Sequence, residues 1–475
     1  MLNAPHDAGR EALLAAAAAF FDQGHFVREL ARRVAIRSTS QDPAGAPELR
    51  RYLVQEIGPT LGALGFDWQL HDNPVPAGGP LLVARRIEHE ALPTVLMYGH
   101  GDVVRGQDAA WTQGQGPWQL AAEGERLYGL GSADNKGQHS INLAALALLL
   151  RLRGRLGFNV KWLFETSEET GSPGLAAFCA AQRALLAADV LIASDGPRLS
   201  RERATVFLGS RGVANFTLEL KLREGGHHSG NWGGLLRNPA TVLASAIACL
   251  VDARGVIRVP ALRPPPVPAN VRRALAGLVF GGDPGDPAVD PDWGEPGLTP
   301  AERVIAWNTL EVLALSAGSP AQPVNAIPPA AKAWMHMRFV VGTDVTRIGE
   351  AVREHLAAHG LADVQVGTAE VMHATRLDPD DAWVRFTLAS IERSTGAAPV
   401  LLPNLGGSLP NDVFADVLGL PTVWIPHSYA GCRQHAPDEH LLAPLAREAL
   451  QIMCGLFWDL AEQAGTLPRR GESRR

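Results

Sequence analysis

The stretch Thr-Val-Leu-Met-Tyr-Gly-His-Gly-Asp, residues 94–102, runs from an apolar segment into a histidine and an aspartate. A short continuous apolar run of this kind is typical of a strand that is buried in a parallel sheet. Similar runs alternate with Ala- and Leu-rich helical segments; the predicted strands are residues 94–100, 159–166, 189–195 and 421–426, and the predicted helices are residues 137–153, 174–188, 381–395 and 442–464. The alternation predicts an α/β fold with a mainly parallel sheet flanked by helices.

The pattern changes in the middle of the chain. Polar and apolar side chains alternate along residues 213–223, as they do in a strand with one exposed face. Further strands are predicted at residues 309–315, 332–341 and 363–373, with helices at 239–253 and 345–359. We therefore expect residues 205–376 to form an α+β domain, with two helices on one face of an antiparallel sheet, inserted between two parts of the α/β domain, residues 1–204 and 377–475.

Two other segments have their own signatures. Residues 10–35 are predicted to form one amphipathic helix that precedes the sheet. Residues 261–300 are rich in proline and glycine, with three consecutive prolines at 264–266, so we expect an irregular loop there.

Composition limits the class of protein. The 475 residues are 46% hydrophobic and 19% charged, which is typical of a globular chain of two or three domains. Because 43 basic and 49 acidic residues give a net charge of −6, neither nucleic acid nor a membrane is expected as a partner. Four cysteines are too few for a disulfide scaffold, and the apolar run at residues 13–21 is too short to span a bilayer. We expect a cytoplasmic protein.

Histidines and carboxylates collect near the predicted strand ends. Taken singly, each has a structural explanation, such as a helix N-cap or a polar turn. Four of the five sites, however, follow a predicted parallel strand at the sheet edge where α/β proteins bind ligands. Two histidines and three carboxylates suit a pair of divalent ions, with one carboxylate bridging and a spare glutamate shuttling protons. The residues concerned are His100 with Asp102, Asp134, Glu168 with Glu169, Asp195, and His435.

A series of short motifs strengthens this interpretation. In chain order they are His-x-Asp (100–102), Asp-Asn-Lys-Gly (134–137), Glu-Glu-x-Gly-Ser (168–172), Ser-Asp-Gly (194–196), His-Ser-Gly (228–230), Gly-Gly-Ser (406–408) and His-x-Pro-x-Glu (435–439). This order resembles the dinuclear metallopeptidase family of carnosinases, aminoacylases, carboxypeptidase G and succinyl-diaminopimelate desuccinylase. The resemblance covers about residues 25–460 and is greatest to the carnosinase-like dipeptidase branch.

The resemblance implies roles for the clustered residues. His100, Asp134 and Asp195 would hold one ion, and Asp134, Glu169 and His435 would hold the other. Glu168 would be the general base, and Asp102 would orient His100. Zinc is the expected metal, with manganese and cobalt as alternatives, because mixed histidine and carboxylate sites accept all three.

The resemblance also implies roles for the insertion, as a lid and dimerisation domain of a homodimer. His228 would reach the active site of the partner chain and stabilise the oxyanion, and Arg338 would bind a substrate carboxylate. Gly407 and Ser408 would contact the same end of the substrate, and Asn308 would also face it.

The implied reaction is hydrolysis of an amide bond next to a free carboxylate in a dipeptide or small peptide. A bridging water, activated by the two ions, would lose a proton to Glu168 and attack the carbonyl. An N-acyl-amino-acid deacylase of the aminoacylase or desuccinylase type remains an alternative, because it also cuts an amide next to a carboxylate. A metal-binding protein without catalysis is disfavoured by the presence of Glu168.

Overall fold

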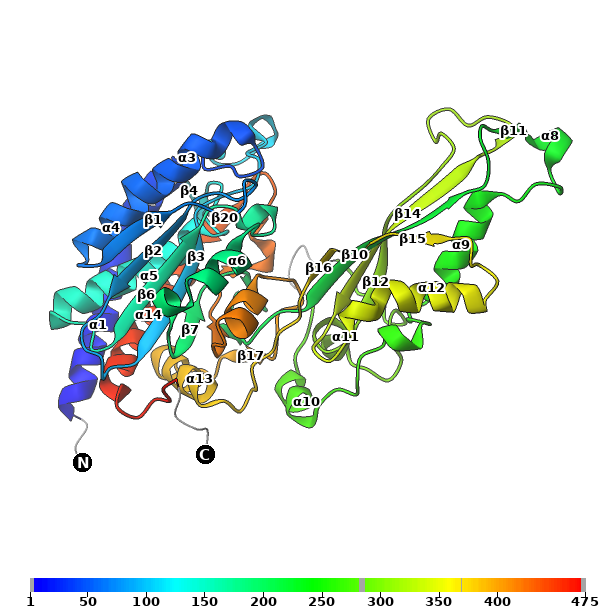
Figure 1. Cartoon of the computed structure of the whole chain (residues 1–475). Helices are drawn as coiled ribbons and strands as arrows, with labels where there is room; N and C mark the ends of the chain where they lie inside the picture. Colours follow the sequence, from blue (N-terminus) through cyan, green and yellow to red (C-terminus); the bar gives the residue numbers. More distant parts are fainter. Residues whose placement is uncertain (1–3, 282–286, 369, 471–475) are drawn as a thin grey trace. The chain divides into compact units, whose positions relative to one another are not determined.

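The computed structural model describes residues 4–281, 287–368 and 370–470, which divide into two compact units (Figure 1). The first unit comprises the chain up to Leu208, Leu377–Leu402, and the part from Pro410 onward. The second unit comprises Gly209–Arg376 and Pro403–Leu409. It therefore takes in the short segment 403–409, which the sequence placed with the α/β domain.

The first unit is built on an eight-stranded sheet, and the predicted α/β class is confirmed. Its strands lie in the order β1 (Asp67–His71), β2 (Leu81–Arg86), β6 (Asn159–Glu165), β3 (Thr94–His100), β7 (Val190–Ala193), β18 (Thr422–Trp424), β9 (Thr205–Phe207) and β17 (Val400–Leu402). The four predicted strands, β6, β3, β7 and β18, are its parallel centre, whereas β2 and β9 pair antiparallel with their inner neighbours. Two small sheets complete this unit. One contains β4 (Ala121–Glu123), β5 (Arg126–Tyr128) and β20 (His440–Leu442), and the other contains β8 (Pro197–Arg198) and β19 (Ser428–Tyr429).

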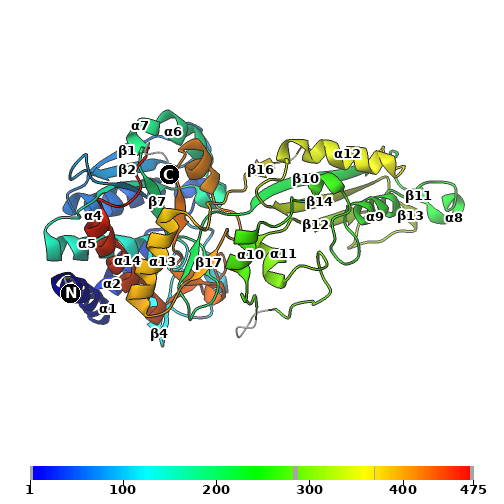
Figure 2. The same ribbon diagram turned by 90° about the horizontal axis from the view of Figure 1, so that it is seen from below.

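Helices flank this sheet, and Figure 2 shows α5 (Lys136–Arg153), α13 (Ala382–Thr395) and α14 (Ala443–Gln463) side by side. The remaining helices are α1 (Ala4–Asp22), α2 (His25–Val34), α3 (Ala46–Arg51), α4 (Gly58–Ala63), α6 (Leu175–Ala181) and α7 (Arg183–Leu186). The single helix predicted over residues 10–35 is wrong, because Gly24 adopts a left-handed conformation (φ 73°) and separates α1 from α2. Within the described residues, no helix is both long and apolar enough to cross a membrane.

The second unit contains an antiparallel sheet in the order β12 (Thr309–Ala317), β14 (Ala330–Phe339), β10 (Gly212–Lys221) and β15 (Gln365–Val366), with β16 (Glu370–Met372) also paired to β10. Side chains alternate along these strands, so Met335 and Met337 enter a core formed with α9 (Pro239–Leu250) and α12 (Ile348–Ala358). The other elements are β11 (His227–His228), β13 (Ala326–Ile327), α8 (Ser229–Trp232), α10 (Ala269–Leu275) and α11 (Pro300–Ile305).

Two predictions for this unit need correction. The segment 261–300 is not wholly irregular, because α10 forms within it, where Val271 and Leu275 pack in a small apolar cluster with Ile305. Residues 282–286 of that segment lie outside the described part of the chain. The single strand predicted over residues 363–373 is instead two short strands, β15 and β16, which pair with different parts of β10.

Candidate metal centre

The sheet topology brings the predicted ligands together in the first unit. His100 is the last residue of β3, and Glu168 and Glu169 lie in a 3-10 turn just after β6. Asp195 follows β7, and His435 lies in the loop beyond β18 and β19. Since β6, β3, β7 and β18 are consecutive neighbours in the sheet, their carboxyl ends open on the same edge.

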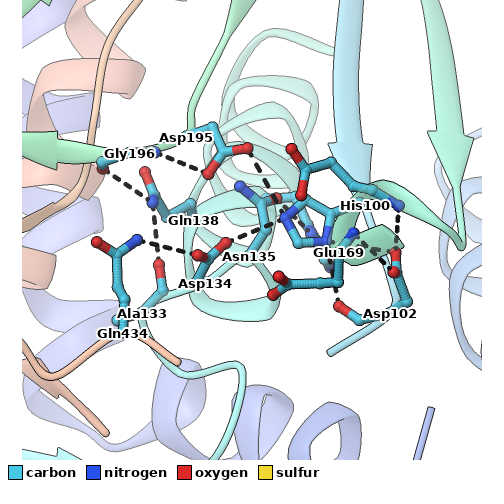
Figure 3. A network of polar contacts seen from close by, with 12 residues as sticks. His100, Asp102, Ala133, Asp134, Asn135, Gln138, Glu169, Asp195, Gly196 and Gln434 are labelled. Atoms are coloured by element: carbon cyan, nitrogen blue, oxygen red, sulfur yellow. Dashed lines mark hydrogen bonds and ion pairs between the residues drawn. The ribbon is translucent and has the colours of Figure 1, made fainter. Parts of the chain in front are cut away.

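Asp134, which lies two residues before the start of α5, is at the centre of this group (Figure 3). Its Oδ1 is 3.0 Å from Nε2 of His100, and its Oδ2 is 3.1 Å from Nε2 of His435. Asp195 Oδ2 lies 3.7 Å from the same His100 nitrogen, and Glu169 Oε2 lies 3.0 Å from the same His435 nitrogen. The side chains thus form two sets that share Asp134, and the candidate ligand atoms of each set lie within 4.8 Å of one another.

The cluster carries more carboxylates than its histidines neutralise. Burial, together with repulsion from Asp134, raises the pKa of Glu169 to about 7 and that of Asp195 to about 6. Burial would also raise the pKa of Asp134, but the hydrogen bonds and charges of His100 and His435 outweigh it and lower that pKa. A cation placed among these carboxylates would therefore be strongly favoured.

The unsatisfied atoms in the cluster fit metal binding. Oε1 of Glu169 and Oδ2 of Asp195 are buried and have no hydrogen-bond partner among the described residues. Buried polar atoms are nearly always paired, so two unpaired carboxylate oxygens on one sheet edge require an explanation. Imidazole nitrogens and carboxylate oxygens are ligands for zinc, manganese and cobalt, and these residues fit a pair of such ions.

Asp102 connects the two halves of the cluster. Its Oδ1 lies 3.4 Å from Nδ1 of His100, and this imidazole nitrogen also donates to the Asp102 main-chain oxygen at 3.1 Å. The same carboxylate accepts hydrogen bonds from the main-chain N–H groups of Glu168 (3.2 Å) and Glu169 (3.1 Å). Asp102 is fully buried, so it fixes both the His100 ring and the turn that carries the two glutamates.

Two supporting residues were not predicted from the sequence. Glu439 Oε1 accepts hydrogen bonds from the main-chain N–H groups of Ala133 (2.9 Å) and Asp134 (3.1 Å), and it therefore holds the loop that presents the shared carboxylate. Gln434 Nε2 donates to Asp134 Oδ2 at 3.1 Å. The sequence signal that could have found them is their closeness to His435 along the chain. Both residues lie within four positions of His435, and Glu439 is the last residue of the His-x-Pro-x-Glu motif.

The remaining predicted site residues belong to the second unit. Arg338 Nη1 donates to Ser408 Oγ at 2.5 Å, and Gly407 directly precedes that serine. His228 is exposed at the start of α8, where its Nδ1 accepts a hydrogen bond from the Gly230 N–H. These contacts assign none of the four residues to the cluster of the first unit.

Asn308 makes its hydrogen bonds within the second unit. The side chain of Asn308 is buried, and its Nδ2 donates to the Leu262 carbonyl (2.8 Å) and to Thr343 Oγ1 (3.0 Å). Its Oδ1 accepts from the Val340 N–H (2.8 Å). These bonds occupy its amide and tie three segments together, and the expected contact of Asn308 with substrate stays a prediction.

Comparisons with known proteins identify a matching family and several relatives. A family model described as Peptidase family M20/M25/M40 matches residues 96–459. The Beta-Ala-His dipeptidase of Mus musculus is 33% identical over 254 residues, which are 50% of this chain and 51% of the mouse protein. The Cysteinylglycine-S-conjugate dipeptidase of Corynebacterium striatum is 28% identical over 332 residues, 67% of this chain and 70% of that protein.

The chain spans about half the length of the mammalian Beta-Ala-His dipeptidases that it matches. The crystal structure of human carnosine dipeptidase 1 superposes with a TM-score of 0.75 at 22% identity, covering 95% of this chain and 99% of the human chain. At that identity, the superposition establishes a shared fold.

Proposed function

The chain belongs to peptidase family M20/M25/M40, and on that premise we propose that it is a metal-dependent hydrolase of dipeptides or small peptides, cutting the amide next to a free carboxylate. The observation that carries the proposal is the position of Asp134, whose two carboxylate oxygens face His100 and His435 at 3.0 and 3.1 Å. Both relatives described above are named as dipeptidases. Their names support dipeptides as the substrate class, and the cluster around Asp134 supports metal-dependent hydrolysis.

Five residues would hold the metal ions. His100, Asp134 and Asp195 would bind one ion, and Asp134, Glu169 and His435 would bind the other. We propose zinc, with manganese and cobalt as the alternatives to be tested. Such a pair of ions, when bound, polarises a carbonyl group and lowers the pKa of water.

Glu168 is the proposed general base. Its carboxylate makes no hydrogen bond among the described residues, and burial together with the charges of Asp195 and Asp134 raises its pKa well above the usual value. A base with a raised pKa takes the proton from the attacking water more readily than an exposed glutamate does. It then gives that proton to the leaving amine nitrogen as the C–N bond breaks, so that one water is consumed and one acid and one amine are released. Asp102 keeps the turn of Glu168 in place.

Substrate binding and assembly complete the proposal. Arg338, held by Ser408, is suited to bind the free carboxylate of the substrate, and Gly407 permits close approach of the main chain. We propose a homodimer in which His228 of the partner subunit donates to the oxyanion. Its exposed position is compatible with that role.

The test of the proposed function is a substrate comparison. The metal-free protein should be loaded separately with zinc, manganese or cobalt and assayed with β-Ala-His, with Cys-Gly, and with N-acetyl amino acids. Hydrolysis of the dipeptides supports the proposal. Hydrolysis of the N-acetyl amino acids alone would replace it with a deacylase, and no hydrolysis of either class under any metal would refute it.

A further inference from the structure

The second unit contains a pocket of about 480 Å³ on the polar face of its sheet. The strand alternation that sends Met335 and Met337 into the core sends His336 and Arg338 to the opposite face. In the neighbouring strand β12, Glu311 lies directly opposite His336 and Thr309 directly opposite Arg338. The floor of the pocket therefore consists of polar side chains fixed by sheet register (strands β12 and β14 in Figure 1).

Aromatic walls rise from the segments that precede β12. Trp293 and Trp307 both line the pocket. Trp293 packs against Gly255, where an added Cβ atom would come within 2.6 Å of the indole. Arg303 fixes the backbone beside Trp293 by donating to the carbonyl groups of Pro291 and Glu295. The walls are thus anchored and offer apolar surface to the body of a ligand.

Arg211 contributes a positive charge to the lining of the pocket, and part of its guanidinium group has no hydrogen-bond partner among the described residues. The residue is only 8% exposed, and its Nε donates to the Gly406 carbonyl at 2.8 Å. Its Nη1, however, has no hydrogen-bond partner among the described residues. Burial, together with the nearby charge of Arg338, lowers the pKa of Arg211 to about 10. An unpaired guanidinium N–H in this setting costs free energy unless an acceptor satisfies it.

The two arginines form one structural group. Ser408 Oγ accepts from Arg338 Nη1 at 2.5 Å and donates to the main-chain oxygen of Arg211 at 2.6 Å. Glu311 attracts Arg211 through space, but the described residues show no ion pair between them. Three carboxylates line the pocket: Glu295 pairs with Arg263, and among the described residues no ion pair joins Glu311 or Asp290 to Arg211 or Arg338. The two guanidinium groups therefore favour an anionic ligand.

We propose that this pocket binds an amino-acid residue that carries two carboxylates, with Arg211 binding the side-chain carboxylate and Arg338 the main-chain carboxylate. The identification of this residue as the carboxyl-terminal residue of the substrate rests on the proposed hydrolase function. The expected substrates are then peptides that end in glutamate or aspartate.

Binding of free amino acids tests the pocket without requiring turnover. L-Glutamate and L-glutamine have nearly the same shape, and both carry the α-amino and α-carboxylate groups, so the ratio of their dissociation constants isolates the side-chain charge. Calorimetry on the metal-loaded full chain should show glutamate binding about 10- to 100-fold more tightly, as expected for a hydrogen bond between charged groups. Arg211→Gln should reduce that ratio to near one.

Three further variants separate a binding role from a structural role. Arg211→Lys keeps the positive charge and should retain part of the preference, whereas Glu311→Gln removes the carboxylate that attracts Arg211 and should increase the preference. Arg353 is exposed on α12, which packs on the other face of the sheet, so Arg353→Gln should leave the ratio unchanged. Glu311→Gln keeps every contact of Arg211 and therefore remains informative even if Arg211→Gln fails to fold.

A ratio near one in the unmodified protein would overturn the proposal, as would an unchanged ratio in a folded Arg211→Gln protein or in Glu311→Gln.

Turnover then tests the link to substrate: Gly-Glu should have a higher kcat/KM than Gly-Gln, and L-glutamate should raise KM for Gly-Glu without changing kcat. Inhibition that lowers kcat at constant KM would show that the pocket does not bind the substrate end. If neither dipeptide is hydrolysed, the proposed function fails, and the binding ratio still tests the pocket.

Discussion

Replacement of Glu168 by glutamine separates proton transfer from metal binding. The substitution conserves shape, and among the described residues the only hydrogen bond between Glu168 and the cluster comes from its main-chain N–H, which donates to Asp102 at 3.2 Å and is unchanged. The proposed metal ligands should therefore stay in place. Removal of a general base typically lowers kcat about 100- to 10,000-fold, or about 2.7–5.5 kcal/mol in activation free energy.

The same substitution should not destabilise the protein. Burial, and the negative charges of Asp195 and Asp134, already disfavour the ionised form of Glu168 and raise its pKa. A neutral amide removes that unfavourable charge, so the metal-free Glu168→Gln protein should unfold at the same temperature as the unmodified protein or at a higher one. The melting temperature of the chelated proteins measures this.

The assay combines steady-state kinetics on a dipeptide with elemental analysis of the same preparation. Glu392 is exposed on α13, so Glu392→Gln is a matched control that should retain full activity. If Glu168→Gln retains both ions and turns over at a near-normal rate, Glu168 is not the base. Loss of metal in Glu168→Gln would show instead that this carboxylate helps to hold the ions.

Three other outcomes are expected. Asp134→Ala should lose affinity for both ions, whereas His435→Ala should weaken mainly one; elemental analysis after dialysis at a fixed metal concentration distinguishes them. Burial raises the pKa of Glu165 from 4.5 to about 7, so the folded state binds its proton more tightly than the unfolded state, and the stability contributed by this group should fall as pH rises from about 4.5 to about 7. Denaturant titrations of the chelated proteins should therefore show that Glu165→Gln loses less unfolding free energy over that pH range than the unmodified protein does. An identical loss in the two proteins would contradict the raised pKa of Glu165. Mixing inactive His228→Ala with inactive Glu168→Gln under subunit exchange should restore up to about a quarter of native activity, because half the dimers are mixed and each has one complete site; no recovery after proven exchange excludes the role of His228 across the dimer.

The centre of the fold was predictable because its strands are continuous apolar runs. The strand at Thr94–His100 has the predicted bounds, and β6 and β18 differ from theirs by only one or two residues at an end. The strands β9 and β17, the last two in the sheet order, were missed, since each has only three residues and no periodicity can be read over that length. The break at Gly24 was missed because one glycine interrupts an otherwise helical pattern.

The clustering of the proposed metal ligands was predictable for a different reason: strand ends converge on one edge of a sheet, so position along the chain specifies position in space. Supporting contacts do not follow that rule. Glu439 holds the Asp134 loop across a separation of 305 residues, and Arg211 approaches Gly406 across 195 residues. Such contacts depend on how loops fold back on the sheet, which no local pattern in the sequence specifies.

The most direct test of the central claim is a metal titration of the chelated protein, with bound ions per chain and the rate of dipeptide hydrolysis measured on the same samples. Two ions should bind per chain at the sites that share Asp134, and hydrolysis should be absent without metal and restored as the sites fill. Full hydrolysis by the metal-free protein, or saturation at fewer than two ions per chain in the active protein, would contradict the account.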